Sequence, residues 1–190
     1  MADYMVEETS GARAIRYGNL AVAIHWLSAA LILTQVYLGF AFGYFPKGTP
    51  ERAELFTAHK TVGVVILLLA LTRLAVRLID APPPYPDHFP KWERRVAVWS
   101  HRTFYFLMIA LPLTGLAAVS KGAKGGLTEL AGGTWFPVVP IPLFGGAHEL
   151  LAFAMIGLIG LHILAALKNQ FVTGGPVAGR MPPFRATDKG

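Results

Sequence analysis

The chain has 190 residues, of which 54% are hydrophobic and only 15% are charged, whereas a soluble domain usually carries about a quarter charged residues. This composition indicates an integral membrane protein, in which a net charge of +6 is typical of cytoplasmic loops and does not by itself indicate nucleic-acid binding. The absence of cysteine excludes disulfides, zinc–thiolate sites, cysteine-ligated iron–sulfur clusters and thioether-linked haem, which leaves six histidines for redox or metal chemistry.

Four long apolar runs follow one another along the chain, each near the roughly 20 residues that an α-helix needs to cross a bilayer. They cover residues 20–42, 57–79, 98–120 and 147–167. The first has no formally charged residue, and a proline-rich stretch ends the second because proline cannot continue the helical hydrogen-bond ladder. The predicted fold class is therefore all-α and membrane-integral, a four-helix transmembrane bundle.

The polar connections and ends predict how the chain is oriented in the membrane. We expect a single domain over 1–190, with a loosely ordered basic tail over 175–190. With four spans, twelve lysines and arginines lie on the side of the two termini and five lie on the other side. The positive-inside rule then predicts that both termini are cytoplasmic.

Five of the six histidines lie within or at the ends of the spans, where an ionisable side chain is costly and indicates a function. They are His25, His59, His101, His148 and His162. Between His148 and His162 there are fourteen steps of about 100° and 1.5 Å, so both imidazoles face one side of their helix, about 21 Å apart. One helix can therefore supply one ligand to each of two stacked sites.

Alternating helix directions give each of these two histidines a partner at matching depth. His59 matches His148 on the outer side, and His25 matches His162 on the inner side. Two facing histidines without a nearby carboxylate or thiolate suit the axial positions of a b-type haem better than zinc, which takes about four ligands. Bis-histidine ligation leaves no open iron position and favours electron transfer over oxygen activation. The simpler interpretation is that each histidine only hydrogen-bonds a neighbouring helix.

Other side chains lie where they can contact a haem carboxylate or a quinone. The cations among them are Arg16, Arg73, Arg77 and Arg102 on the inner side and Lys60 on the outer side. A role in setting the orientation of the chain in the membrane explains these cations as well as a contact to a haem carboxylate does. His101 has no depth-matched partner, so a contact to an inner propionate or a quinone carbonyl competes with a helix-packing hydrogen bond. Glycines such as Gly39, Gly63 and Gly115 would make room for a flat macrocycle, as small residues do at any close helix pair.

Several short motifs, taken in their order and spacing, resemble the bacterial cytochrome b561 family of four-helix di-haem inner-membrane proteins. They are IHW at 24–26, AHKTVG at 58–63, LTRL at 71–74, IALPLTG at 109–115, AHE at 147–149 and GLH at 160–162. The resemblance covers most of the chain. It implies two haem b groups stacked across the membrane, with His25, His59, His148 and His162 as the iron ligands.

The resemblance implies an electron-transfer activity in one of two forms. Some members are similar to a superoxide oxidase, which passes electrons from superoxide at the periplasmic face through the haems to ubiquinone. Others look like haem-bearing subunits that serve a separate dehydrogenase or hydrogenase. The implied partners are membrane lipid, quinone, and superoxide or another periplasmic donor, with no nucleic acid. From the residues alone, a histidine-based metal transporter is a further hypothesis, disfavoured because no Asp or Glu lies mid-span.

Overall fold

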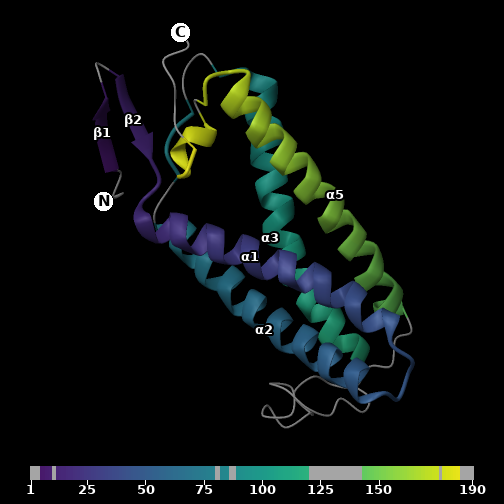
Figure 1. Ribbon diagram of the computed structural model, residues 1–190. Helices are drawn as coiled ribbons and strands as arrows, with labels where there is room; N and C mark the ends of the chain where they lie inside the picture. Colours follow the sequence, from purple (N-terminus) through teal and green to yellow (C-terminus); the bar gives the residue numbers. More distant parts are fainter. Residues whose placement is uncertain are drawn as a thin grey trace. The chain divides into compact units, whose positions relative to one another are not determined.

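The computed structural model describes residues 5–9, 12–79, 82–85, 89–119, 143–175 and 177–184. Four long α-helices dominate these residues (Figure 1). They are α1 (Asn19–Ala41), α2 (Pro50–Ile79), α3 (Lys91–Val119) and α5 (Leu143–Phe171). Each is long and apolar enough to cross a membrane, which confirms the predicted four-helix membrane architecture.

Three of the helices extend beyond the apolar runs that predicted them. Helix α2 begins at Pro50, a position at which a backbone N–H would have no partner within the helix, so proline costs no hydrogen bond there. The Thr49 hydroxyl caps the helix by accepting the Arg52 N–H at 3.4 Å. Helix α3 begins at Lys91, within the stretch expected to be a polar connection. An apolar run indicates only the part of a helix that lies in the hydrocarbon core of the bilayer. The first turns of these helices are polar, so hydropathy did not indicate that they are helical.

A short hairpin precedes the helices and was not predicted. Strand β1 (Met5–Thr9) pairs antiparallel with β2 (Ala12–Arg16), so that Met5 lies opposite Arg16 and Thr9 opposite Ala12. Two strands of five residues give only a weak alternating pattern, which explains why the sequence did not indicate them. The membrane-spanning part of the chain is all-α, as expected.

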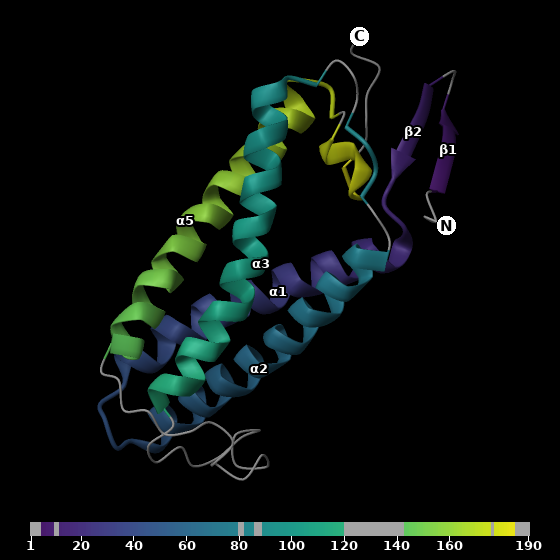
Figure 2. The ribbon, with the colours of Figure 1, turned by 180° about the vertical axis from the view of Figure 1, so that it is seen from behind.

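The helices contribute to two compact units. The terminal unit contains residues 1–26, 72–104 and 157–190, and the central unit contains residues 27–71 and 105–156. Each helix therefore supplies one part of its length to each unit. Within the central unit, α1 lies beside α2 and α3 lies beside α5, as both views show (Figures 1 and 2).

The apolar side chains face outward more than inward. Buried hydrophobic residues are few and include Ile66 and Ala70 of α2 and Met155 of α5. Large side chains such as Leu33 and Leu164 are more than half exposed. An apolar surface of this kind marks contact with lipid, because water would make it unfavourable.

The C-terminal segment differs from the loosely ordered tail that the sequence predicts. After two glycines with positive φ, Gly174 and Gly175, residues 177–184 include the 3₁₀ helix η2 (Ala178–Arg180) and are held by hydrogen bonds to other parts of the terminal unit. We call residues 177–184 the strap. Residues 185–190 lie outside the described part of the chain.

Candidate functional site

The central unit brings together the two histidines predicted to pair on the outer side. His59 of α2 and His148 of α5 have ring centroids 6.2 Å apart, with their planes at 78°. Two imidazoles bound to one metal through nitrogen, at about 2.0–2.1 Å per bond, would have centroids about 6 Å apart. The observed separation therefore fits two axial ligands on one iron.

Each of these rings lies against a glycine of a neighbouring helix. A Cβ built on Gly115 would lie 3.1 Å from Cε1 of His148, and one built on Gly39 would lie 3.3 Å from Cε1 of His59. The rings thus occupy the space that side chains at these positions would fill. Gly63 has a different neighbour, because a Cβ there would meet the Gln35 amide nitrogen at 3.2 Å.

A backbone carbonyl fixes the hydrogen position on the His148 ring. Its Nδ1 lies 2.9 Å from the Leu111 carbonyl oxygen and 3.3 Å from the Thr114 hydroxyl. A carbonyl only accepts, so Nδ1 donates and the other ring nitrogen, Nε2, keeps a free lone pair for a metal. Thr114 in turn donates to the Ala110 carbonyl at 2.8 Å.

The His59 ring has different surroundings on α1. Its Nδ1 is buried and has no hydrogen-bond partner among the described residues, while the Gln35 side-chain amide donates to the His59 backbone carbonyl at 3.0 Å. Gln35 lies four residues before Gly39, as Leu111 lies four residues before Gly115. In both cases a residue one turn before the glycine hydrogen-bonds the histidine residue, and the glycine leaves a gap for the ring.

The terminal unit brings together three histidines, one more than the predicted inner pair. His25 of α1 and His162 of α5 have centroids 6.4 Å apart at 54°, and His101 of α3 lies 5.8 Å from His162 at 85°. His101 donates from Nδ1 to the carbonyl of Ala97 in its own helix at 2.6 Å. The helix-packing hydrogen bond considered for His101 is therefore an intrahelical one.

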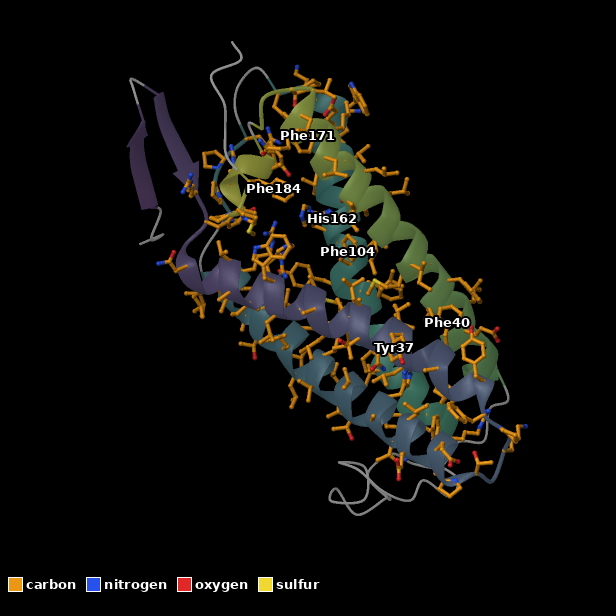
Figure 3. The ribbon with its side chains drawn as sticks, in the orientation of Figure 1. Tyr37, Phe40, Phe104, His162, Phe171 and Phe184 are labelled. Atoms are coloured by element: carbon orange, nitrogen blue, oxygen red, sulfur yellow. The ribbon has the colours of Figure 1, made fainter. Side chains whose placement is uncertain are left out.

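An arginine and two aromatic rings surround this histidine cluster. Nη2 of Arg73 lies 3.0 Å from Nδ1 of His25, and because guanidinium only donates, that nitrogen is the acceptor. The indole ring of Trp26 meets the His25 ring edge-on with centroids 5.2 Å apart. Phe104 of α3 lies 5.3 Å from His162, and Figure 3 shows these two side chains next to each other.

The remaining predicted cations occupy different surroundings. Lys60 is only 9% exposed and lies next in sequence to His59, with its ammonium group over the Phe56 ring at 5.2 Å. Arg77 is half-buried in the last turn of α2. Arg102 is exposed and lies over Trp99, while Arg16 is half-buried at the end of β2. Arg73 thus contacts a predicted ligand directly, whereas Lys60 is next to one in sequence.

The donor set fits a haem better than a bare metal ion. Within the described residues there is no group of three or more His, Cys, Asp or Glu side chains that could hold a metal ion. A porphyrin brings four nitrogens of its own and needs only two axial ligands. In the outer pair, Nε2 of His148 is available directly. In the inner pair, Nδ1 of His25 accepts from Arg73, so the ring carries its hydrogen on Nε2, and this contact has to be exchanged before Nε2 can bind iron. Glycines beside the rings and the Nδ1–carbonyl bond of His148 fit the same cofactor.

Comparison with known proteins gives consistent matches along the chain. A family model described as prokaryotic cytochrome b561 matches residues 16–183. The chain is 30% identical over 188 residues to cytochrome b561 homolog 2 of Escherichia coli (strain K12), covering 92% of this chain and 95% of that protein. It is 25% identical over 175 residues to cytochrome b561 homolog 1 of the same strain, covering 90% and 98%. It is 30% identical over 175 residues to the probable superoxide oxidase CybB of Yersinia pestis, covering 88% and 96%.

Proposed function

The chain belongs to the prokaryotic cytochrome b561 family, and from this premise we propose that it carries two haem b groups, one in each unit. Family membership makes it a haem b protein of electron transfer in the bacterial inner membrane. The observation that carries the proposal is that each unit contains its own facing histidine pair, at 6.2 Å and 6.4 Å. Bound haem b accepts and releases single electrons, and two axial histidines leave no position for oxygen.

In this proposal His59 and His148 hold the outer haem, and His25 and His162 hold the inner haem. The Nδ1–carbonyl bond of His148 supports its part, because it leaves Nε2 unprotonated. Lys60 is the proposed carboxylate partner of the outer haem. Arg16, Arg73 and Arg77 are proposed to contact the inner haem carboxylates, and His101 to contact a carboxylate or the quinone.

The proposed orientation places both termini, and with them the terminal unit, on the cytoplasmic side. Supporting this, the first turns of α3 carry a dense group of cations within the terminal unit. They are Lys91, Arg94, Arg95 and Arg102. Cytoplasmic loops carry this excess because positive segments are retained there during insertion.

We further propose that superoxide is the electron donor at the periplasmic face and ubiquinone the acceptor. Each superoxide anion gives up one electron and becomes dioxygen, while ubiquinone takes up two electrons and two protons to become ubiquinol. A relative named as a probable superoxide oxidase, 30% identical to this chain, supports this donor. The cation Lys60, next in sequence to His59, supports it physically because a positive charge attracts an anion.

A reduced-minus-oxidised spectrum with pyridine-haemochrome quantitation tests the cofactor, followed by superoxide and then ubiquinone in the same cuvette. We expect two b haems per chain, reduced by superoxide and reoxidised by the quinone. Two haems that do not respond to superoxide would instead indicate a carrier for a partner dehydrogenase or hydrogenase. A protein without haem would contradict the proposal altogether.

Single histidine variants test the ligand pairs. We expect His148→Ala and His162→Ala each to lose one of the two haems, and His101→Ala to retain both. His25 and His101 both lie near His162, so either could be the second ligand of the inner iron. The His101→Ala variant separates these two possibilities. Loss of a haem in His101→Ala but not in His25→Ala would assign the inner iron to His101 instead.

A further inference from the structure

The strap is anchored at its beginning by one side chain at the end of α5. The Asn169 side-chain oxygen accepts the backbone N–H groups of Val177 at 3.1 Å and Ala178 at 2.7 Å, and the Gly175 N–H donates to the Asn169 carbonyl at 2.8 Å. Two of these bonds come from a side chain that is itself 8% exposed. The chain therefore turns back from α5 in a defined direction.

A buried arginine fixes the middle of the strap. Arg180 is 8% exposed, and its guanidinium donates to the carbonyls of Pro83 at 3.1 Å and Pro84 at 2.7 Å. It also lies over the Tyr85 ring, 5.9 Å from the centroid, and its backbone carbonyl accepts the Tyr17 N–H at 3.3 Å. A charged side chain is expensive to bury, so these contacts have to be formed together for it to stay there.

The end of the strap reaches the first proposed ligand of the inner haem through a tryptophan. The indole N–H of Trp26 donates to the Pro182 carbonyl at 2.6 Å, across 156 positions in the sequence. The same indole lies against the His25 ring at 5.2 Å and 80°. All of these residues belong to the terminal unit.

We infer that the strap is part of the inner haem site, with Arg180 and Trp26 as positioning residues for His25. The inference rests on the proposed function, in which His25 is an axial ligand. Arg180 holds the strap, the Pro182 carbonyl fixes the plane of the Trp26 indole, and the indole limits rotation of the His25 ring. Groups that orient an axial ligand tune both the affinity and the potential of the metal, although they do not touch it.

Two conservative variants of the full-length haem-loaded protein test this arrangement. Trp26→Phe keeps an aromatic ring but loses the indole donor to Pro182. Arg180→Lys keeps the charge but cannot donate to two carbonyls in the fixed geometry of guanidinium. The matched controls are Trp99→Phe and Arg95→Lys, because both residues are exposed on α3.

The measurements are redox potentiometry, the rate of haem transfer to apomyoglobin, and amide hydrogen exchange of the strap. We expect both test variants to shift the midpoint of the haem that is lost in His162→Ala and to leave the other midpoint unchanged. We expect that haem to be released about 3- to 10-fold faster, as the loss of one hydrogen bond predicts. The double variant should add little to either single one, because both act through the same strap.

Faster exchange of the strap with both midpoints and both release rates unchanged would show a merely structural strap and would overturn the inference. Equal shifts of both haems would overturn it as well, since they indicate a general loss of packing. Wild-type protein that holds no haem would instead overturn the proposed function, and the inference that rests on it. The three results are distinguishable in one set of samples.

Discussion

Gly115 of α3 lies directly against the imidazole of His148 of α5, so that a Cβ built on it would be 3.1 Å from Cε1 and 3.2 Å from Nδ1. The ring cannot move aside freely, because its Nδ1 is bonded to the Leu111 carbonyl of the helix that carries Gly115. The position of the proposed outer ligand therefore depends on the absence of a side chain one turn further along α3.

The first prediction is that Gly115→Ala lowers occupancy of the outer haem and destabilises the protein by about 1–3 kcal/mol, as overpacking does. Haem stoichiometry and thermal unfolding in detergent measure the two effects. Gly63→Ala is the graded control, since its Cβ would meet the end of a flexible Gln35 side chain at 3.2 Å. Gly146→Ala should have no effect, because nothing lies within 4 Å of a Cβ there. Equal losses in all three variants would contradict this explanation.

The second prediction concerns electrostatic attraction of an anionic donor. Arg52 donates to the carbonyls of Phe42 at 3.0 Å and Phe45 at 2.8 Å, and Lys60 follows the proposed ligand His59 directly in sequence. We expect Lys60→Gln to slow the second-order reduction of the haems by superoxide and to weaken its dependence on salt. Stopped-flow measurements at several ionic strengths test this.

The control for this experiment is Lys47→Gln, which removes an exposed cation earlier in the chain. It should change the rate less than Lys60→Gln does. Haem content is measured in both variants, because Lys60 is also the proposed partner of an outer haem carboxylate. An unchanged rate and salt dependence in Lys60→Gln, with haem content retained, would show that Lys60 does not attract the donor.

The sequence was sufficient to predict which histidines lie together, because helix geometry alone fixes depth and face. The structure brings His25 near His162 and His59 near His148, the same two pairs. Their role as iron ligands stays a prediction. His101 could not be paired by depth, because it belongs to a cluster of three rather than a pair.

The strap could not be predicted for a different reason. Its contacts join residues that lie far apart in sequence, such as Trp26 and Pro182, and no local pattern reports such a contact. In the sequence, Arg180 is one of the cations of a basic tail that indicate membrane orientation. In the structure its guanidinium is buried and donates to two carbonyls. Composition describes the tail as a whole, but order within it depends on single long-range hydrogen bonds.

The third prediction is a pH dependence outside the membrane-spanning segments. Burial raises the pKa of Tyr85 above its usual value of 10.0, helped by Tyr17 and opposed by the nearby arginines Arg77, Arg180 and Arg94. A pKa raised in the folded state means that neutral Tyr85 stabilises the fold below about pH 10. This stability is lost as the pH rises through the folded-state pKa.

The measurement is the tyrosinate absorbance of wild-type protein minus that of Tyr85→Phe, followed from neutral to alkaline pH. We expect the difference signal to titrate above pH 10, together with faster hydrogen exchange of the strap. The variant should lack the part of the alkaline destabilisation that comes from Tyr85. A difference signal that titrates below pH 10 would contradict the burial of this hydroxyl.

The fourth prediction follows from the cation beside the inner histidines. The Arg73 guanidinium lies 3.0 Å from Nδ1 of His25, whose ring centroid lies 6.4 Å from that of His162. A positive charge near a haem favours the reduced form, because the oxidised iron carries one more positive charge. We expect Arg73→Gln to lower the midpoint potential of the inner haem and to leave that of the outer haem nearly unchanged. Arg77→Gln, one turn further along α2, is the matched control and should give a smaller shift, since the contact to His25 is made by Arg73. A rise in the inner midpoint, or equal shifts in both variants, would show that Arg73 acts on this site in another way.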